Sequence, residues 1–280
     1  MTICACVKVP EGIVLATDSI TSVNSGTWEP KKVVIKTWSN QKKLFQVGSL
    51  PIGVMHYGTG KIGGRTIARF IREFKPPTKN VKEVARLLSE SVRAAYVAEY
   101  SRLTARMQPF LGLYFAGYSN HSCSGEEWDL QLPNDPQPCL VRKGLMYGTS
   151  WRGADRTFTR LIKGYDPDMF NALVNAGVNA KLLKKTVAKF EFHASYETMP
   201  VQDAVNLAVY ILRITIGSAT LFTGANAAPA CGGPLQVAAI LPDTGFKWLM
   251  NSPLTVREEP MPEPIPRDRP LYTESYDRGF

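Results

Sequence analysis

The chain has 280 residues, of which 44% are hydrophobic and 20% charged. These proportions are typical of a globular protein with a sizeable core, so they exclude disordered and fibrous chains. The formal net charge of +9 comes from dispersed lysines and arginines that cluster at most in short doublets. Because no recognition motif accompanies them, we expect a solvated basic surface and no nucleic-acid partner.

The N-terminus and the cysteines indicate a cytoplasmic protein. Lys8, Glu11 and Asp18 interrupt any apolar segment at the start, so we expect a mature N-terminus without a secretory signal. No apolar run reaches the roughly eighteen residues of a spanning helix, so no membrane partner is expected. The cysteines number 5, without a C-x-x-C pair, which indicates reduced and mostly buried thiols and no metal site.

The first sixty residues are expected to be rich in β-structure. Residues 3–9 and 13–17 are apolar runs joined by a Pro-Glu-Gly turn at 10–12, which predicts a β-hairpin. Turn residues then separate three further strand-like runs, at 33–37, 43–47 and 52–57.

The spacing of apolar residues then changes to that of helices. Residues 62–74 and 81–105 carry an apolar residue every three or four positions, with Pro76 and Pro77 between them. A strand is expected at 111–118, followed by a polar loop at 119–138. The remaining expected elements are strands at 139–141, 145–147, 235–241 and 246–248, and helices at 154–163, 180–190 and 201–216.

This order of elements favours an α+β fold. Strands and helices come in separate groups, not as alternating strand–helix–strand units, so we expect antiparallel sheets with helices on their outer faces. One domain is expected over residues 1–252. Residues 253–280 are rich in proline and charge and are expected to form an extended tail.

Thr2 is the first candidate for chemistry. Threonine is small enough for the initiator methionine to be trimmed, which would leave Thr2 with a free α-amine. Such an amine titrates at about pH 7.7–8.0, so it can act as the base for its own hydroxyl without a histidine. A nearby lysine would lower the pKa of the amine, and an aspartate would hold that lysine. Asp18 ends the predicted hairpin, which would bring it beside Thr2, and Lys43 opens a later strand.

Residues 2–19 (TICACVKVPEGIVLATDS) resemble the opening of proteasome β subunits and of their bacterial relatives. The spacing from Thr2 to Asp18 matches that family without a gap, and the resemblance covers roughly residues 2–250. It implies a four-layer α/β/β/α sandwich of two antiparallel sheets, the fold of N-terminal-nucleophile hydrolases. It also implies that Thr2 is the nucleophile.

The resemblance assigns roles to later residues as well. Lys43 would tune the nucleophile, and the backbone N–H of Gly58 would form the oxyanion hole. Residues 147–150 (YGTS) resemble the segment that carries the family's active-site serine, which puts Thr149 or Ser150 in that place. Residues 231–233 (CGG) resemble the family's Ser-Gly-Gly strand entry.

Three features depart from the family pattern. An insertion between Asp18 and Lys43 makes Lys32 a rival for the catalytic lysine. Ala228 stands where the family has an aspartate that supports the threonine. Only Met1 precedes Thr2, as in the simpler bacterial relatives.

The leading hypothesis is therefore a threonine-type N-terminal-nucleophile amidohydrolase, a peptidase that forms an acyl-enzyme on Thr2 and needs no metal or organic cofactor. Its substrate would be a peptide or protein. The alternatives are a catalytically inactive proteasome-like structural subunit and a basic nucleic-acid-binding module. Members of the family assemble into rings, so the resemblance also implies a homo-oligomer; an unfoldase partner is not indicated by the sequence.

Overall fold

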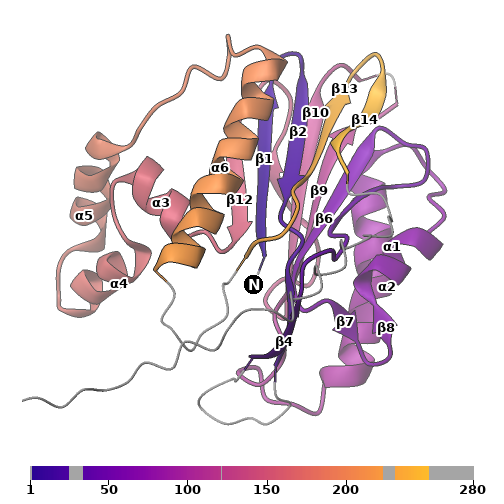
Figure 1. Ribbon diagram of the computed structural model, residues 1–280, viewed down its shortest axis with the longest axis horizontal. Helices are drawn as coiled ribbons and strands as arrows, with labels where there is room; N and C mark the ends of the chain where they lie inside the picture. Colours follow the sequence, from indigo (N-terminus) through magenta and orange to yellow (C-terminus); the bar gives the residue numbers. More distant parts are fainter. Residues whose placement is uncertain (1, 25–33, 121, 223–230, 252–280) are drawn as a thin grey trace, which may run out of the picture.

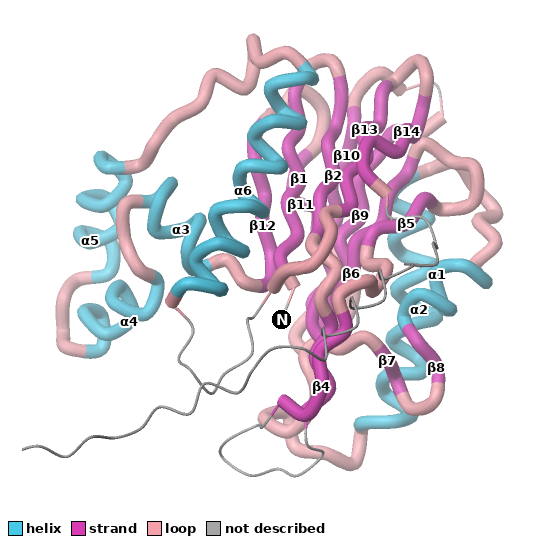
Figure 2. Tube along the Cα trace, viewed as in Figure 1, coloured by secondary structure: helices cyan, strands magenta, loops and turns pink. Residues whose placement is uncertain are grey.

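The computed structural model describes residues 2–24, 34–120, 122–222 and 231–251. Its strands form two five-stranded antiparallel sheets (Figures 1 and 2). The first sheet has the order β12-β1-β2-β13-β14, with β1 (Ile3–Val9), β2 (Gly12–Thr17), β12 (Gly148–Gly153), β13 (Gln236–Leu241) and β14 (Gly245–Met250). The second has the order β11-β10-β9-β6-β5, with β5 (Leu44–Gln46), β6 (Ile52–Gly58), β9 (Leu111–Tyr118), β10 (Gly125–Leu132) and β11 (Cys139–Arg142).

Two short hairpins complete the strands, β3 (Thr21–Asn24) with β4 (Val34–Trp38) and β7 (Lys61–Ile62) with β8 (Arg65–Thr66). The helices are α1 (Ile67–Glu73), α2 (Val81–Tyr100), α3 (Arg156–Lys163), α4 (Pro167–Asn175), α5 (Ala180–Val187) and α6 (Val201–Leu221), with a 3₁₀ turn at Ala188–Phe190. Helix α2 packs on β9 and β10, while α6 packs on β1 and β2. Helices α3 to α5 stand beside α6 (Figure 1).

The core forms where these surfaces meet. Side chains of both sheets share one apolar cluster, which includes Cys4, Leu15, Tyr57, Tyr114 and Ala238. The outer face of each sheet is covered by its helices through separate apolar clusters. Strands β1 and β2 are buried along their whole length, which explains why their sequences are continuously apolar instead of alternating. The expected α+β class with antiparallel sheets is confirmed.

Several local predictions were wrong. Residues 119–138 contain β10 and are not only a polar loop, and residues 61–66 form the β7–β8 hairpin before α1 begins. Helix α2 ends at Tyr100, before the predicted end at residue 105. Helix α4 was not expected, and residues 145–147 are not a strand. The predicted tail at 253–280 lies outside the described residues.

Helix α6 modifies the expectation about membranes. Among the residues that the structure describes, it is the one helix whose length and composition would allow it to cross a membrane, a test that buried core helices also pass. Its inner face, with Ala204, Ala208, Ile211 and Leu212, is buried in the cluster that covers β1 and β2. The helix is thus part of this core.

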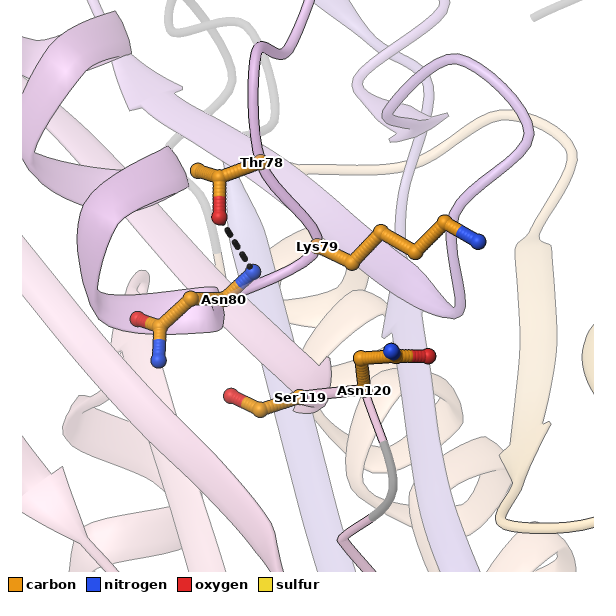
Figure 3. Close-up of a pocket in the computed structure, with 5 residues that line it drawn as sticks. All are labelled: Thr78, Lys79, Asn80, Ser119 and Asn120. Carbon is orange, nitrogen blue, oxygen red and sulfur yellow. Dashed lines mark hydrogen bonds between the residues drawn. The ribbon is translucent and has the colours of Figure 1, made fainter.

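A small pocket lies at the start of α2. It has a volume of about 280 Å³ and is lined by Thr78, Lys79, Asn80, Ser119 and Asn120 (Figure 3). Asn80 Oδ1 accepts a hydrogen bond from the Glu83 N–H at 3.0 Å, and Ser119 Oγ accepts one from the Val81 N–H at 3.1 Å. These contacts cap the helix, so its start accounts for the polar lining.

Candidate active site

The backbone of Thr2 is held from both sides. Its carbonyl oxygen accepts a hydrogen bond from the Ala154 N–H at 2.7 Å, and the next N–H, that of Ile3, donates to Asp18 Oδ1 at 3.1 Å. Gly153 lies so close that an added Cβ would stand 1.8 Å from the Thr2 oxygen, and its φ of +90° also favours glycine. Thr2 is buried, and its hydroxyl has no hydrogen-bond partner in the described part of the chain.

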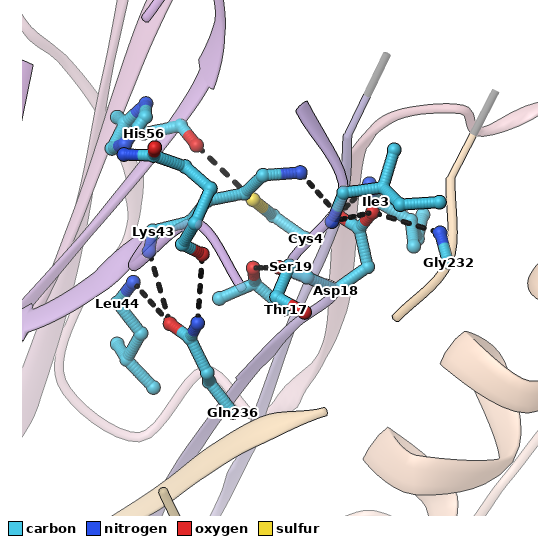
Figure 4. Close-up of polar contacts among 12 residues, drawn as sticks. Ile3, Cys4, Thr17, Asp18, Ser19, Lys43, Leu44, His56, Gly232 and Gln236 are labelled. Carbon is cyan, nitrogen blue, oxygen red and sulfur yellow. Dashed lines mark hydrogen bonds and ion pairs between the residues drawn. The ribbon is translucent and has the colours of Figure 1, made fainter. Parts of the chain in front are cut away.

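Asp18 connects this strand to Lys43. Its Oδ1 accepts the Lys43 Nζ at 2.8 Å as well as the Ile3 N–H, so the ammonium and that N–H lie within about 6 Å of one another (Figure 4). Its Oδ2 accepts the backbone N–H groups of Ile20 at 3.3 Å and Gly232 at 3.0 Å. Both side chains of the ion pair are almost fully buried, with 3% and 0% exposure. The structure thus brings three sequence candidates, Thr2, Asp18 and Lys43, together.

Gln236 was missed by the sequence reasoning. Its Oε1 accepts the backbone N–H groups of Lys43 at 2.9 Å and Leu44 at 3.1 Å, and its Nε2 donates to the Gln41 carbonyl at 2.9 Å (Figure 4). The side chain therefore clamps the start of β5, from which the Lys43 ammonium reaches Asp18. A buried amide at the start of β13 carries no local sequence signal, because its partners lie about 190 positions away.

Gly58 ends β6, where the strand still pairs with β9 but, among the described residues, has passed the end of β5 on its other side. The N–H and C=O groups of Val54 and His56 are directed toward β5. Because these groups alternate in direction along a strand, those of Gly58 are directed to the same side, at a point beyond the first residue of β5. Its φ is +84°, and an added Cβ would stand 2.4 Å from the Phe110 carbonyl oxygen. The backbone requires glycine here, and its N–H is directed to the edge where Lys43 lies.

Thr149 and Ser150 are placed elsewhere. Strand β12 pairs with β1 so that Ser150 faces Cys6, whereas Ala154 reaches Thr2. Ser150 Oγ accepts from Arg142 Nη1 at 2.9 Å and donates to Glu127 Oε2 at 3.3 Å. The structure therefore does not bring either residue to Thr2. The rival Lys32, and Ala228 in place of the expected aspartate, lie outside the described residues.

Burial is the main cause of the shifted pKa values of the ionisable groups around this ion pair. The pKa of His56 is lowered to about 4, first by burial and then by the Lys43 charge, so the imidazole is neutral at pH 7. The pKa values of the thiols Cys4 and Cys231 are raised, again first by burial, with that of Cys231 reaching about 12. Both thiols are therefore protonated at pH 7 and unsuited to act as nucleophiles. In the described part of the chain no group of three or more His, Cys, Asp and Glu could hold a metal ion.

A cleft opens next to the Thr2 strand. It has a volume of about 960 Å³ and begins at Gly153 and Ala154, with its other walls formed by α3, the start of α4 and the end of α6. Arg156 and Arg160 line it, and both donate to Asp166, whose pKa they hold far below its usual range. The cleft is large enough for several residues of a peptide.

No known family profile matches the chain, and no curated protein matches it. Solved structures do. The helical assembly of the Anbu complex from Pseudomonas aeruginosa matches with a TM-score of 0.50 and 11% sequence identity, over 89% of this chain and 86% of that one. The fold is shared with Anbu. Anbu (ancestral beta-subunit) from Yersinia bercovieri matches with a TM-score of 0.48 and 14% identity, over 89% and 87% of the two chains.

The Pseudomonas aeruginosa match corrects the family assignment. The opening residues resemble catalytic proteasome β subunits, but this structural similarity is to Anbu, a proteasome-like relative, and does not identify a catalytic N-terminal-nucleophile hydrolase. At 11% identity the similarity concerns the fold alone. The chemistry of this chain must therefore be argued from its own residues.

Proposed function

We propose that this chain hydrolyses amide bonds with the Thr2 hydroxyl as nucleophile, after removal of Met1. The observation that carries the proposal is the double hydrogen bond to Asp18 Oδ1, from Lys43 Nζ at 2.8 Å and the Ile3 N–H at 3.1 Å. It holds a buried ammonium beside the peptide unit that follows Thr2, close to where the freed α-amine would lie. The like charge would lower the pKa of that amine and keep it available as a base.

The proposed reaction begins when the Thr2 amine takes the proton of the Thr2 hydroxyl. The oxygen then forms a bond to the substrate carbonyl carbon, and the Gly58 N–H stabilises the resulting oxyanion. The C–N bond breaks as the protonated amine returns its proton to the leaving nitrogen. Water then attacks the acyl carbon and gives its proton to the same amine. The C–O bond to Thr2 breaks, the amine returns the proton to the Thr2 oxygen, and the carboxylic acid product leaves.

We infer that the substrate is a peptide or an unfolded protein segment. The cleft of about 960 Å³ beside Gly153 and Ala154 adjoins the residues that hold the Thr2 carbonyl. Its size exceeds what a single small amide would fill.

Mass spectrometry with a β-lactone probe tests the proposal. The protein should lose Met1, gain one probe mass, and carry it on Thr2 in the N-terminal peptide. Thr2→Val, which has nearly the same shape but no hydroxyl, should gain none, whereas Thr2→Ser should still react. Retention of Met1, or equal labelling of Thr2→Val, would refute the proposal.

The second candidate is an inactive subunit of an assembly. It is favoured by the position of Thr149 and Ser150 at the level of Cys6, which leaves no second hydroxyl from this segment beside Thr2. The described surface also exposes large apolar side chains on its outer helices, among them Met169, Leu182, Tyr210 and Leu221. An unlabelled protein that sediments as an oligomer would support this candidate over the enzyme.

Self-association is proposed for either candidate. The Pseudomonas aeruginosa Anbu complex forms a helical assembly, and the apolar surface of the outer helices offers contacts to a second copy. We also infer that the sheets and helices stack as an α/β/β/α sandwich. The supporting contacts are those of α2 on β9 and β10, of β1 and β2 on β6, and of α6 on β1 and β2. Sedimentation as a monomer would count against the association.

A further inference from the structure

Two carboxylates lie buried between the sheets, on the same face of β10. Glu127 and Asp129 are 0% and 4% exposed. Each is paired with an arginine from another strand and receives a tyrosine hydroxyl: Arg142 and Tyr114 for Glu127, Arg152 and Tyr57 for Asp129. A buried carboxylate is stable only when paired and hydrogen-bonded in this way.

The partners of Asp129 come from the two strands that would carry the reaction. Tyr57 OH donates to Asp129 Oδ1 at 2.7 Å, and Arg152 Nε donates to Oδ2 at 2.6 Å. Tyr57 directly precedes Gly58, the proposed oxyanion donor. Arg152 directly precedes Gly153, which packs against the Thr2 carbonyl.

The surroundings of Cys4 show that the contacts of Asp129 with Tyr57 and Arg152 lie next to the Lys43–Asp18 pair. Cys4 faces Arg152 across the β1–β12 pairing, and its thiol touches the His56 carbonyl at 3.9 Å. After burial, the charges that act on the pKa of this thiol are those of Lys43, Asp18, Asp129 and Arg152. Both ion pairs therefore lie near this one buried thiol.

The ring of Tyr57 is buried and closely packed. It packs over Gly112, where an added Cβ would stand 2.0 Å from Tyr57 Cζ, and it lies 5.6 Å from the ring of Phe110. A ring packed in this way couples the position of its hydroxyl to its own backbone, and hence to the next N–H.

We propose that Asp129 is a positioning residue, which fixes the Gly58 N–H relative to Thr2 by holding Tyr57 of one sheet and Arg152 of the other. The inference rests on the proposed function. An oxyanion donor acts only within hydrogen-bond distance of the developing charge, and a displacement of about 1 Å can lower a rate by about a hundredfold. A link between the two sheets keeps this separation constant.

The chain itself provides a matched control. Glu127 lies two residues earlier on β10, and Ser150, its partner on β12, faces Cys6 instead of Cys4. Two strand residues correspond to about 7 Å farther from Thr2. Removal of a contact to Glu127 should therefore destabilise the core as much as removal of one to Asp129, but leave the reaction unchanged.

The experiment compares Tyr57→Phe with Tyr114→Phe, which each remove one oxygen and keep the ring. The rate of β-lactone labelling is measured against probe concentration, which separates the maximal rate from the binding constant, and urea unfolding is measured in parallel. Tyr57→Phe should lower the maximal rate about tenfold with an unchanged binding constant, whereas Tyr114→Phe should stay within about twofold of the original protein. Asp129→Asn should lower the maximal labelling rate more than Tyr57→Phe does, whereas Glu127→Gln should leave this rate unchanged.

The outcomes separate the two hypotheses. If the original protein labels at Thr2 and Tyr57→Phe labels as fast as Tyr114→Phe, the positioning role is wrong and the proposed function stands. If both tyrosine variants lose rate in proportion to lost stability, the role is only structural and the inference is again refuted. If the original protein does not react, the proposed function fails and the inference fails with it.

Discussion

The clamp formed by Gln236 leads to the sharpest prediction about stability. Gln236→Leu removes the acceptor of the Lys43 and Leu44 N–H groups and the donor to the Gln41 carbonyl. Gln41 is half-buried, so water can replace its lost donor, but Lys43 and Leu44 are fully buried. Each buried group left unpaired costs about 1–3 kcal/mol, so the substitution should lower the free energy of unfolding by about 2–6 kcal/mol. That is a large part of the roughly 5–15 kcal/mol of an ordinary domain.

Urea unfolding followed by tryptophan fluorescence measures this loss. Gln46→Leu is the control, because Gln46 lies on β5, the strand that Gln236 clamps, and its side chain donates one hydrogen bond in the described part of the chain, from Nε2 to the Leu50 carbonyl at 3.1 Å. It should cost less than about 1 kcal/mol. Gln236→Glu keeps an oxygen that can accept both N–H groups and should label with the β-lactone faster than Gln236→Leu. If Gln236→Leu is no less stable than Gln46→Leu, the clamp does not hold β5 and the reasoning is refuted.

Other predictions concern the ion pair, the nucleophile's carbonyl and pH. Lys43→Met leaves the Asp18 carboxylate buried with the backbone donors of Ile3, Ile20 and Gly232, so it should cost about 3–5 kcal/mol in urea unfolding. The double variant with Asp18→Asn should recover part of this loss. Gly153→Ala should abolish labelling, because its Cβ would overlap the Thr2 oxygen, whereas Gly144→Ala, with a positive φ but open space, should label normally. His56 has a folded pKa of about 4, below its ordinary 6.5, so the unfolded chain binds the extra proton. Stability should therefore fall by up to about 3 kcal/mol as the pH drops from 6.5 to 4, and His56→Gln should flatten this slope in unfolding curves.

The local sequence pattern was enough to predict the strands whose apolar side chains are buried among apolar neighbours. The β1–β2 hairpin and the strand at Ile52–Gly58 follow from apolar runs between turn residues, because both faces of these strands are buried among apolar neighbours. The hairpin placed Asp18, since it returns its end to its beginning, whereas Lys43 followed from a later strand and the family resemblance, with Lys32 as its rival. The ion pair between Asp18 and Lys43 is the contact that this reasoning expected.

Strand β10 was missed because its charges are neutralised by distant residues. Glu127 and Asp129 read as a solvated loop in sequence, but Arg142 and Arg152 reach them from β11 and β12. Burial of these carboxylates is possible only once the sheets have assembled, and no local window contains the compensating charges.

The register of β12 is the second feature that tertiary structure decided. A Tyr-Gly-Thr-Ser segment suggested that Thr149 or Ser150 reaches Thr2, but the pairing of Ser150 with Cys6 sets them apart from it, and brings Ala154 to the Thr2 carbonyl. A strand's register depends on which partner side chains it packs against. A shift of two residues keeps every side chain on the same face of the sheet, so the pattern of apolar residues does not fix the register. The sequence thus predicted that Thr2 and Asp18 lie together with a lysine, Lys43 or its rival Lys32, whereas the places of Gln236, Asp129 and Arg152 were decided only when the two sheets came together.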